Sequence, residues 1–272
     1  MPSLTVDGYP MHYAEAGSGA PLVLVHGSLN DYRNWAPQMA PLGAHFHVVA
    51  PSLRHYWPER WDGSGGRFKI DQHVADLAGF ITALGAGPVH LVGHSRGGHI
   101  AFRLAELHPH LIGRLVLAEP GGELDESLGG QPVAPGVKGR QAQAFAAAAE
   151  LVRAGDVEGG LRRFAEHTGG PGAWEKRSEA RKAIGRDNAH TLAGQVDEQR
   201  RPFSRAAAEG IRLPTLLVHG AETQPSFIAI VEALQRCIAG SRRVVIPGAG
   251  HSMGSDNPEA FNAAVLAFLE ER

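Results

Sequence analysis

Six consecutive residues, Gly93-His94-Ser95-Arg96-Gly97-Gly98, have the types and the spacing of a nucleophile on a sharp turn. They follow a short apolar run, 89–92, and precede a stretch with helical spacing that begins near Arg96. The pattern G-x-S-x-G between a strand and a helix raises a serine hydroxyl above a sheet, and its glycines remove Cβ atoms that would clash there. The sequence therefore predicts covalent catalysis by Ser95. The alternative is an ordinary serine in a glycine-rich turn.

A serine hydroxyl becomes an effective nucleophile when a base accepts its proton. Among the fifteen histidines, His251 is the best candidate, because its loop, 247–252, directly follows the last apolar run. Loops that follow parallel strands open at one edge of a sheet, so we expect His251 on the same edge as Ser95. His26 and His94 lie beside motif glycines and are expected to pack or to orient loops. No two histidines have the H-E-x-x-H spacing, so we expect no metal site.

A carboxylate is expected to orient the imidazole of this base and to stabilise its charged form. Glu119 directly follows the apolar run 112–118, and Glu222 follows the apolar run 215–219. Glu119 is favoured because the end of a strand holds a side chain more rigidly than a turn does. An ion pair at a hinge is the alternative role for Glu119, and Glu222 remains the alternative acid.

The elements that must position these residues alternate along the chain. Short apolar runs of strand type are separated by stretches of helical spacing, which is typical of an α/β fold with a mostly parallel sheet and helices on both faces. The expected strands are 3–6, 11–14, 22–25, 45–50, 89–92, 112–118, 215–219 and 243–246, and the expected helices of this part are 71–84, 95–107, 227–238 and 258–269.

The alternation is interrupted between residues 120 and 213. Residues 121–136 are rich in Gly and Pro, and residues 141–154 and 158–167 have a helical composition without runs of strand type. We therefore expect a core made of residues 1–119 and 214–272, with a helical insertion at 120–213.

Composition excludes several classes of function. The 26 Lys and Arg balance 28 Asp and Glu, so no strong field would attract a nucleic acid or an anionic membrane. The single cysteine, Cys237, excludes an internal disulfide and indicates a reducing, cytoplasmic location. The N-terminal residues lack the pattern of a signal peptide, and no run of about 18 apolar residues occurs. The expected partner is a small-molecule substrate, with no nucleic acid, membrane, cofactor or metal.

Taken together, the motifs resemble those of the α/β-hydrolase family over nearly the whole chain. They are HG at 26–27, GHSRGG at 93–98, the helical stretch after the sixth strand, and GAGHS at 248–252. The resemblance implies an eight-stranded, mostly parallel sheet with a helical cap inserted after the sixth strand. It also implies that the backbone N–H groups of Ser28 and Arg96 form an oxyanion hole. The Ser28 hydroxyl could add a further donor or could face a loop.

The chain departs from the family at the position of the acid. Most members place an Asp three residues after the glycine that closes the seventh strand, and Thr223 stands there in this sequence. Glu222 is one residue away from that position. Some relatives, such as a branch of the haloalkane dehalogenases, keep the acid after the sixth strand, which corresponds to Glu119.

The resemblance suggests a serine hydrolase that cleaves a small, fairly apolar carboxylic ester or lactone through an acyl-enzyme. The alternatives are a carbon–carbon bond hydrolase with the same triad and a non-catalytic ligand-binding homologue. Family members that act on epoxides or haloalkanes carry Asp where this chain has Ser95, which disfavours those reactions. Trp35, Trp57 and Trp61 are expected to form an apolar wall of the pocket, or, for Trp57 and Trp61, simply to anchor a long loop.

Overall fold

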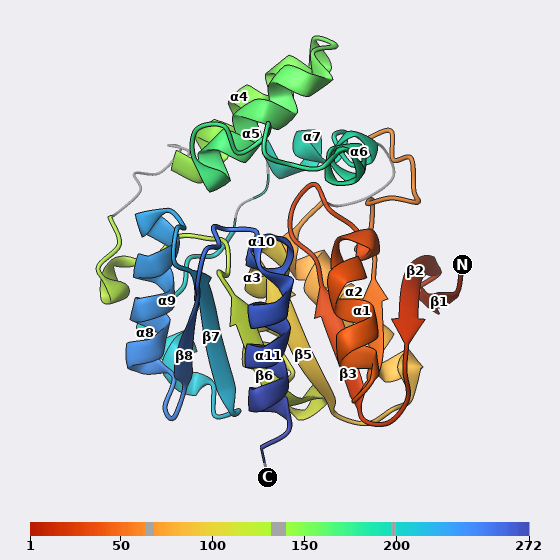
Figure 1. The fold of residues 1–272 in the computed structure, drawn as a ribbon, viewed down its shortest axis with the longest axis vertical. Helices are drawn as coiled ribbons and strands as arrows, with labels where there is room; N and C mark the ends of the chain where they lie inside the picture. Colours follow the sequence, from red (N-terminus) through yellow and green to blue (C-terminus); the bar gives the residue numbers. More distant parts are fainter. Residues whose placement is uncertain (64–67, 132–139, 197, 199, 272) are drawn as a thin grey trace.

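A computed structural model describes residues 1–271 except 64–67, 132–139, 197 and 199, so part of the expected Gly- and Pro-rich stretch lies outside the described residues. Its centre is a sheet with the strand order β1-β2-β4-β3-β5-β6-β7-β8 (Figure 1). The pairs β1–β2 and β2–β4 are antiparallel, and the other five neighbouring pairs are parallel. The predicted eight-stranded, mostly parallel sheet is thus confirmed. The strands are β1 (Ser3–Val6), β2 (Tyr9–Ala16), β3 (Pro21–Val25), β4 (His47–Pro51), β5 (Val89–His94), β6 (Ile112–Ala118), β7 (Thr215–Gly220) and β8 (Arg242–Ile246).

The central strands are apolar at successive positions because both faces of the sheet are buried. In β3, Val23 and Val25 belong to the apolar cluster on one face, whereas Leu22 and Leu24 belong to the cluster on the other. The first face is covered by α2 (Ile70–Leu84), α3 (Arg96–Leu107), α8 (Arg205–Gly210) and α9 (Pro225–Cys237). The second face is covered by α1 (Ala36–Gly43) and α11 (Pro258–Leu269), with the short α10 (Met253–Asp256) beside them.

Four further helices lie together beyond the carboxyl ends of the parallel strands (Figure 1). Three of them, all but the one at 179–187, contribute to a separate apolar cluster, which also takes in Leu29 from the loop after β3. Through Leu29 and the polar contacts described below, these helices cover the loops that follow the strands. They are α4 (Arg140–Arg153), α5 (Val157–Gly169), α6 (Glu179–Asp187) and α7 (Thr191–Val196).

The chain leaves and re-enters the core at neighbouring points. The N–H of Asp125 donates to the carbonyl of Phe203, and the N–H of Phe203 donates to the carbonyl of Glu123. Helix α8 falls within the stretch 120–213 as well, but Ala208 packs in the core cluster of the sheet, beside α3 and α9. The helices that lie apart from the sheet, α4 to α7, fall between Asp125 and Phe203 in the sequence.

No helix among the described residues combines the length and the apolar character that crossing a membrane requires.

Candidate active site

Ser95 lies on the turn between β5 and α3, as the motif predicts. Its backbone has φ 53° and ψ −116°, a conformation that costs a non-glycine residue about 1–3 kcal/mol. The flanking glycines permit the turn by close approach of the backbone. A Cβ on Gly97 would lie 2.2 Å from the carbonyl oxygen of Val25, and one on Gly93 would lie 2.4 Å from the carbonyl oxygen of Gly97. Any larger residue at either position would force the turn apart.

Glu119 lies beside Ser95 because β5 and β6 pair in register. His94 is opposite Ala118, so the next residues, Ser95 and Glu119, leave the ends of adjacent parallel strands together. Glu119 also has a positive φ, of 43°. Its backbone N–H donates to the carbonyl of Val218 on β7, which turns the chain across the carboxyl edge of the sheet.

The carboxylate of Glu119 is fully buried and accepts three hydrogen bonds. The N–H of Gly220 donates to Oε1 at 2.8 Å, and the hydroxyl of Thr223 donates to Oε2 at 2.8 Å. The third donor is the Nδ1–H of His251, at 2.5 Å from Oε2. A buried carboxylate needs such donors to replace the water that it loses. This arrangement therefore fixes Glu119 in contact with the imidazole of His251.

The loop after β8 holds His251 between two rings. Phe227 of α9 stacks on the imidazole at a centroid distance of 4.0 Å and an interplanar angle of 15°. On another side, His94 donates its Nε2–H to the carbonyl of His251 at 2.7 Å. In the described residues, the hydroxyl of Ser95 forms no hydrogen bond with His251. Such a bond can be long in an unliganded site and tighten when substrate binds.

The structure separates the two candidate acids. Glu222 is exposed, and its backbone N–H donates to the carbonyl of Ala249. Glu119 contacts His251, as the sequence favours. Thr223, at the position where the family has its usual Asp, donates a hydrogen bond to Glu119 instead of holding the histidine itself.

The loop after β3 passes directly beside the nucleophile. A Cβ on Gly27 would lie 3.1 Å from Cβ of Ser95. Ser28 follows, and its hydroxyl donates to Oε1 of Gln195 in α7 at 2.6 Å, so this hydroxyl faces α7 rather than offering its proton to a substrate. Arg96 is the first residue of α3, where a backbone N–H has no acceptor within the helix.

His26 and His94 orient loops, as predicted. His26 accepts the N–H of Leu53 at Nε2 and donates Nδ1–H to the carbonyl of Gly27, which joins the loops after β3 and β4. Burial lowers the pKa of His26 to about 4 and that of His94 to about 3. Both rings are therefore neutral near pH 7, and each donates a hydrogen bond from the one ring nitrogen that carries a proton.

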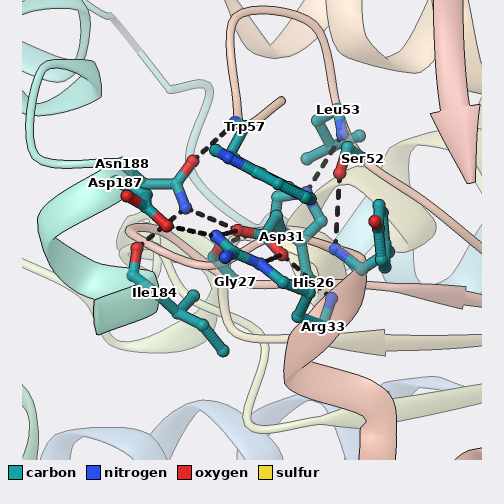
Figure 2. Close-up of polar contacts among 11 residues, drawn as sticks. His26, Gly27, Asp31, Arg33, Ser52, Leu53, Trp57, Ile184, Asp187 and Asn188 are labelled. Carbon is teal, nitrogen blue, oxygen red and sulfur yellow. Dashed lines mark hydrogen bonds and ion pairs between the residues drawn. The ribbon is translucent and has the colours of Figure 1, made fainter. Parts of the chain in front are cut away.

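Asn188, the residue that follows α6, joins these loops (Figure 2). Asn188 donates from Nδ2 to Oδ2 of Asp31 at 2.7 Å, and its Oδ1 accepts the backbone N–H of Trp57 at 2.8 Å. Asp31 also binds the guanidinium of Arg33, which extends to Asp187 at the end of α6. The loop after β3, the loop after β4 and α6 thus share one buried hydrogen-bond network.

The three tryptophans have partners of their own. Trp35 is 2% exposed and packs against Phe261 in the cluster between the sheet and α11, and it also lines a small cavity together with His94 and Ser252. The short 3-10 turn that ends at Trp35 directs the ring inward. The guanidinium of Arg33 lies 3.7 Å from the centroid of Trp57, and Trp61 stacks on His55 at 4.4 Å. These contacts anchor the loop between β4 and α2.

The side chain of Arg96 is a feature that the sequence analysis did not anticipate. It is fully buried and binds both carboxylate oxygens of Glu198, and it also contacts Nδ1 of His73 at 2.9 Å. The position of Arg96 inside the glycine-rich motif was a signal that its side chain is buried, and a buried arginine requires a buried acceptor. No sequence signal identified that acceptor, Glu198, which lies 102 residues further along the chain.

No group of three or more His, Cys, Asp or Glu side chains suited to a metal ion occurs in the described parts of the chain.

Comparison with known proteins identifies a family. A family model described as the alpha/beta hydrolase fold matches residues 20–258. Epoxide hydrolase 3 of Mus musculus is 26% identical over 282 residues, which span 100% of this chain and 77% of that protein. The soluble epoxide hydrolase of Corynebacterium sp. strain C12 is 34% identical over 114 residues, which span 42% of this chain and only 39% of the relative.

Solved structures share the same architecture. The enol-lactonase of Burkholderia xenovorans LB400 superposes with a TM-score of 0.79, at 22% identity over 99% of this chain and 100% of that one. Similarity at this level of identity concerns the fold.

Proposed function

The chain belongs to the α/β-hydrolase family and is a hydrolase, and from this premise we propose that it cleaves a small carboxylic ester or lactone with Ser95 as nucleophile. The observation that carries the proposal is the hydrogen bond of 2.5 Å between His251 Nδ1 and Glu119 Oε2. It joins a base and an acid at the sheet edge where Ser95 leaves its strand. A serine, a histidine and a carboxylate in this relation are the parts of acyl-transfer catalysis.

In the proposed reaction, Ser95 Oγ attacks the carbonyl carbon while His251 Nε2 accepts its proton. Glu119 accepts the Nδ1–H bond throughout, which keeps the free lone pair on Nε2 and stabilises the imidazolium that forms. The backbone N–H groups of Ser28 and Arg96 bind the developing oxyanion. His251 then returns the proton to the departing alcohol oxygen, which leaves an acyl group on Ser95. Water, losing its proton to His251, attacks this acyl group, and the acid is released as His251 returns that proton to Ser95 Oγ.

The named relatives offer a rival reaction, because two of them are epoxide hydrolases. Family members of that kind carry Asp at the nucleophile position, whereas this chain has Ser95. A serine that attacks an epoxide would form a stable ether instead of a hydrolysable ester, which favours a carbonyl substrate. A carbon–carbon bond hydrolase would use the same residues and differ only in the bond cleaved.

The proposal is tested with short-chain p-nitrophenyl esters and a simple lactone, by comparing the wild-type chain with Ser95→Ala. We expect turnover by the wild type and a loss of roughly 10³-fold or more in kcat for the variant. A fluorophosphonate probe should label wild-type Ser95 but not the variant. Wild-type turnover by Ser95→Ala would contradict the nucleophile assignment, and absence of labelling in the wild type would favour a non-catalytic homologue.

A further inference from the structure

The two residues expected to form the oxyanion hole lie on different loops, but the same segment contacts the side chains of both. Ser28 follows β3, and Arg96 begins α3. The Ser28 hydroxyl donates to Oε1 of Gln195, which is buried at the end of α7. This bond uses the only hydroxyl proton of Ser28, so the contribution of Ser28 to an oxyanion comes from its backbone N–H.

Arg96 is held by the residue three positions after Gln195. Both terminal nitrogens of Arg96 bind Glu198, at 2.5 Å each, and the two side chains are 0% and 1% exposed. On its other side, Arg96 donates to Nδ1 of His73 at 2.9 Å. The Nε2–H of His73 donates to the carbonyl of Arg54, so the ring is neutral and its Nδ1 is free to accept.

Arg200 closes the connection between the two contacts. Its Nε donates to Oε2 of Glu198 at 2.8 Å, and its Nη2 donates to Oε1 of Gln195 at 3.3 Å. A continuous path of hydrogen bonds therefore runs from Ser28 through Gln195, Arg200 and Glu198 to Arg96. Burial raises the pKa of Glu198, but Arg96 and Arg200 outweigh this effect and hold it at about 2, so Glu198 is a carboxylate at neutral pH.

We propose that Gln195 and Glu198 are positioning residues that hold the two oxyanion-binding loops at a fixed separation. An oxyanion hole is effective only when its donors are already placed where the charge develops, with errors below about 0.5 Å. The backbones of Ser28 and Arg96 are themselves constrained by positive φ values at their neighbours, 57° at Leu29 and 53° at Ser95. The hydrogen-bonded path adds a link between the two loops. This inference rests on the proposed function, because it requires that Ser95 forms a tetrahedral intermediate.

The test compares Gln195→Met, which keeps the volume but removes the acceptor, with Ser28→Ala, which removes the donor and keeps the backbone N–H. We expect each to lower kcat for a p-nitrophenyl ester by about 10- to 100-fold with KM changed less than threefold, as for an interaction made only in the transition state. The double variant should lose no more than either single variant.

The inhibition constant of a trifluoromethyl ketone, which mimics the oxyanion, should rise by the same factor as kcat/KM falls.

The contact of Glu198 with Arg96 is tested by Arg96→Met, because Arg200 still pairs with the Glu198 carboxylate and no buried charge is left without a partner. This variant keeps the backbone N–H of residue 96 and should also lose kcat at nearly constant KM. Gln131→Met, at an exposed position in the loop before α4, is the matched control and should retain wild-type kinetics.

The outcomes separate this inference from the proposed function. If the wild type turns over the ester while Gln195→Met keeps kcat within twofold, or changes only KM or thermal stability, the positioning role is wrong and the proposed function stands. If the wild type neither turns over esters nor reacts with a fluorophosphonate at Ser95, the proposed function is wrong and the inference fails with it.

Discussion

At the scale of single residues, the unusual feature is the site of the carboxylate that contacts His251. Thr223 stands where the family usually has its Asp, and its hydroxyl donates to Glu119, which contacts His251 from the end of the neighbouring strand β6. The same oxygen, Oε2, receives both bonds. Thr223 therefore donates a hydrogen bond to a carboxylate that follows β6, whereas most family members place the carboxylate after β7.

Replacing Glu119 with Gln tests the proposed role of this carboxylate. The amide keeps the shape but lacks the charge that orients and stabilises the imidazole, so kcat should fall by roughly 10³- to 10⁴-fold. The exposed Glu222→Gln is the matched control and should change kcat less than twofold. Steady-state kinetics with a p-nitrophenyl ester measure both, and the reverse ranking would assign the acid to Glu222.

At the scale of elements, the loops that carry the site depend on α6. Asn188 joins Asp31, in the loop after β3, to the backbone of Trp57, in the loop after β4 (Figure 2). Asp31 and Asn188 are both 0% exposed. Buried polar groups in one network stabilise a specific arrangement when all are satisfied, and they are costly when one partner is removed. The helices beyond the sheet are therefore part of the support of the expected site.

Asn188→Ala should lower the free energy of unfolding by about 2–3 kcal/mol, because it leaves the N–H of Trp57 and one oxygen of Asp31 with fewer partners. Asp187→Asn is the control in the same network. Its ion pair with Arg33 is partly exposed, so the loss should stay below about 1 kcal/mol. Urea unfolding at constant pH measures both variants, and equal effects would mean that the buried amide has no special role.

At the scale of the whole molecule, the abundance of histidine makes stability depend on pH. His26, His73 and His99 are buried and His94 is half-buried, each against a carbonyl acceptor, and desolvation lowers the pKa of all four below the ordinary value of 6.5. In the unfolded chain these rings bind protons below about pH 6.5, whereas in the folded chain they stay neutral to lower pH. The unfolded state therefore gains protons first, and stability falls as the pH falls.

The free energy of unfolding should decrease between pH 7 and pH 5, with each buried neutral ring contributing up to about 2 kcal/mol. His26 adds to this decrease because its imidazole gains a proton near pH 6.5 in the unfolded chain but only near pH 4 in the folded chain. His26→Gln should reduce the pH dependence by about that amount, although it also lowers stability at pH 7. His110→Gln, at an exposed position, is the control and should leave the pH dependence of stability unchanged. Urea unfolding at pH 7 and pH 5 measures both variants. A larger effect of His110→Gln than of His26→Gln would contradict the role of the buried rings.

Sequence reasoning predicted the strands and most helices because the signals for them are local. Buried strands such as β3 and β5 are runs of apolar residues, and the turn at Ser95 needs glycines within two positions of it. It also placed Ser95 and His251 at one edge of the sheet, because parallel strands end there together. Helices α6 and α7, which are short and polar in part, gave no comparable signal.

What only the tertiary structure decided is which side chains meet. The contact of His251 with Glu119 joins residues 132 positions apart, and that of Arg96 with Glu198 joins residues 102 positions apart. The side chain of Trp35 packs in the core against Phe261, and the position of Trp35 in the sequence after β3 did not reveal this. Periodicity and turn chemistry act over a few residues and so can be read along the chain. The partner of a buried charge depends instead on the register of strands and the packing of loops, which exist only once the whole fold has formed.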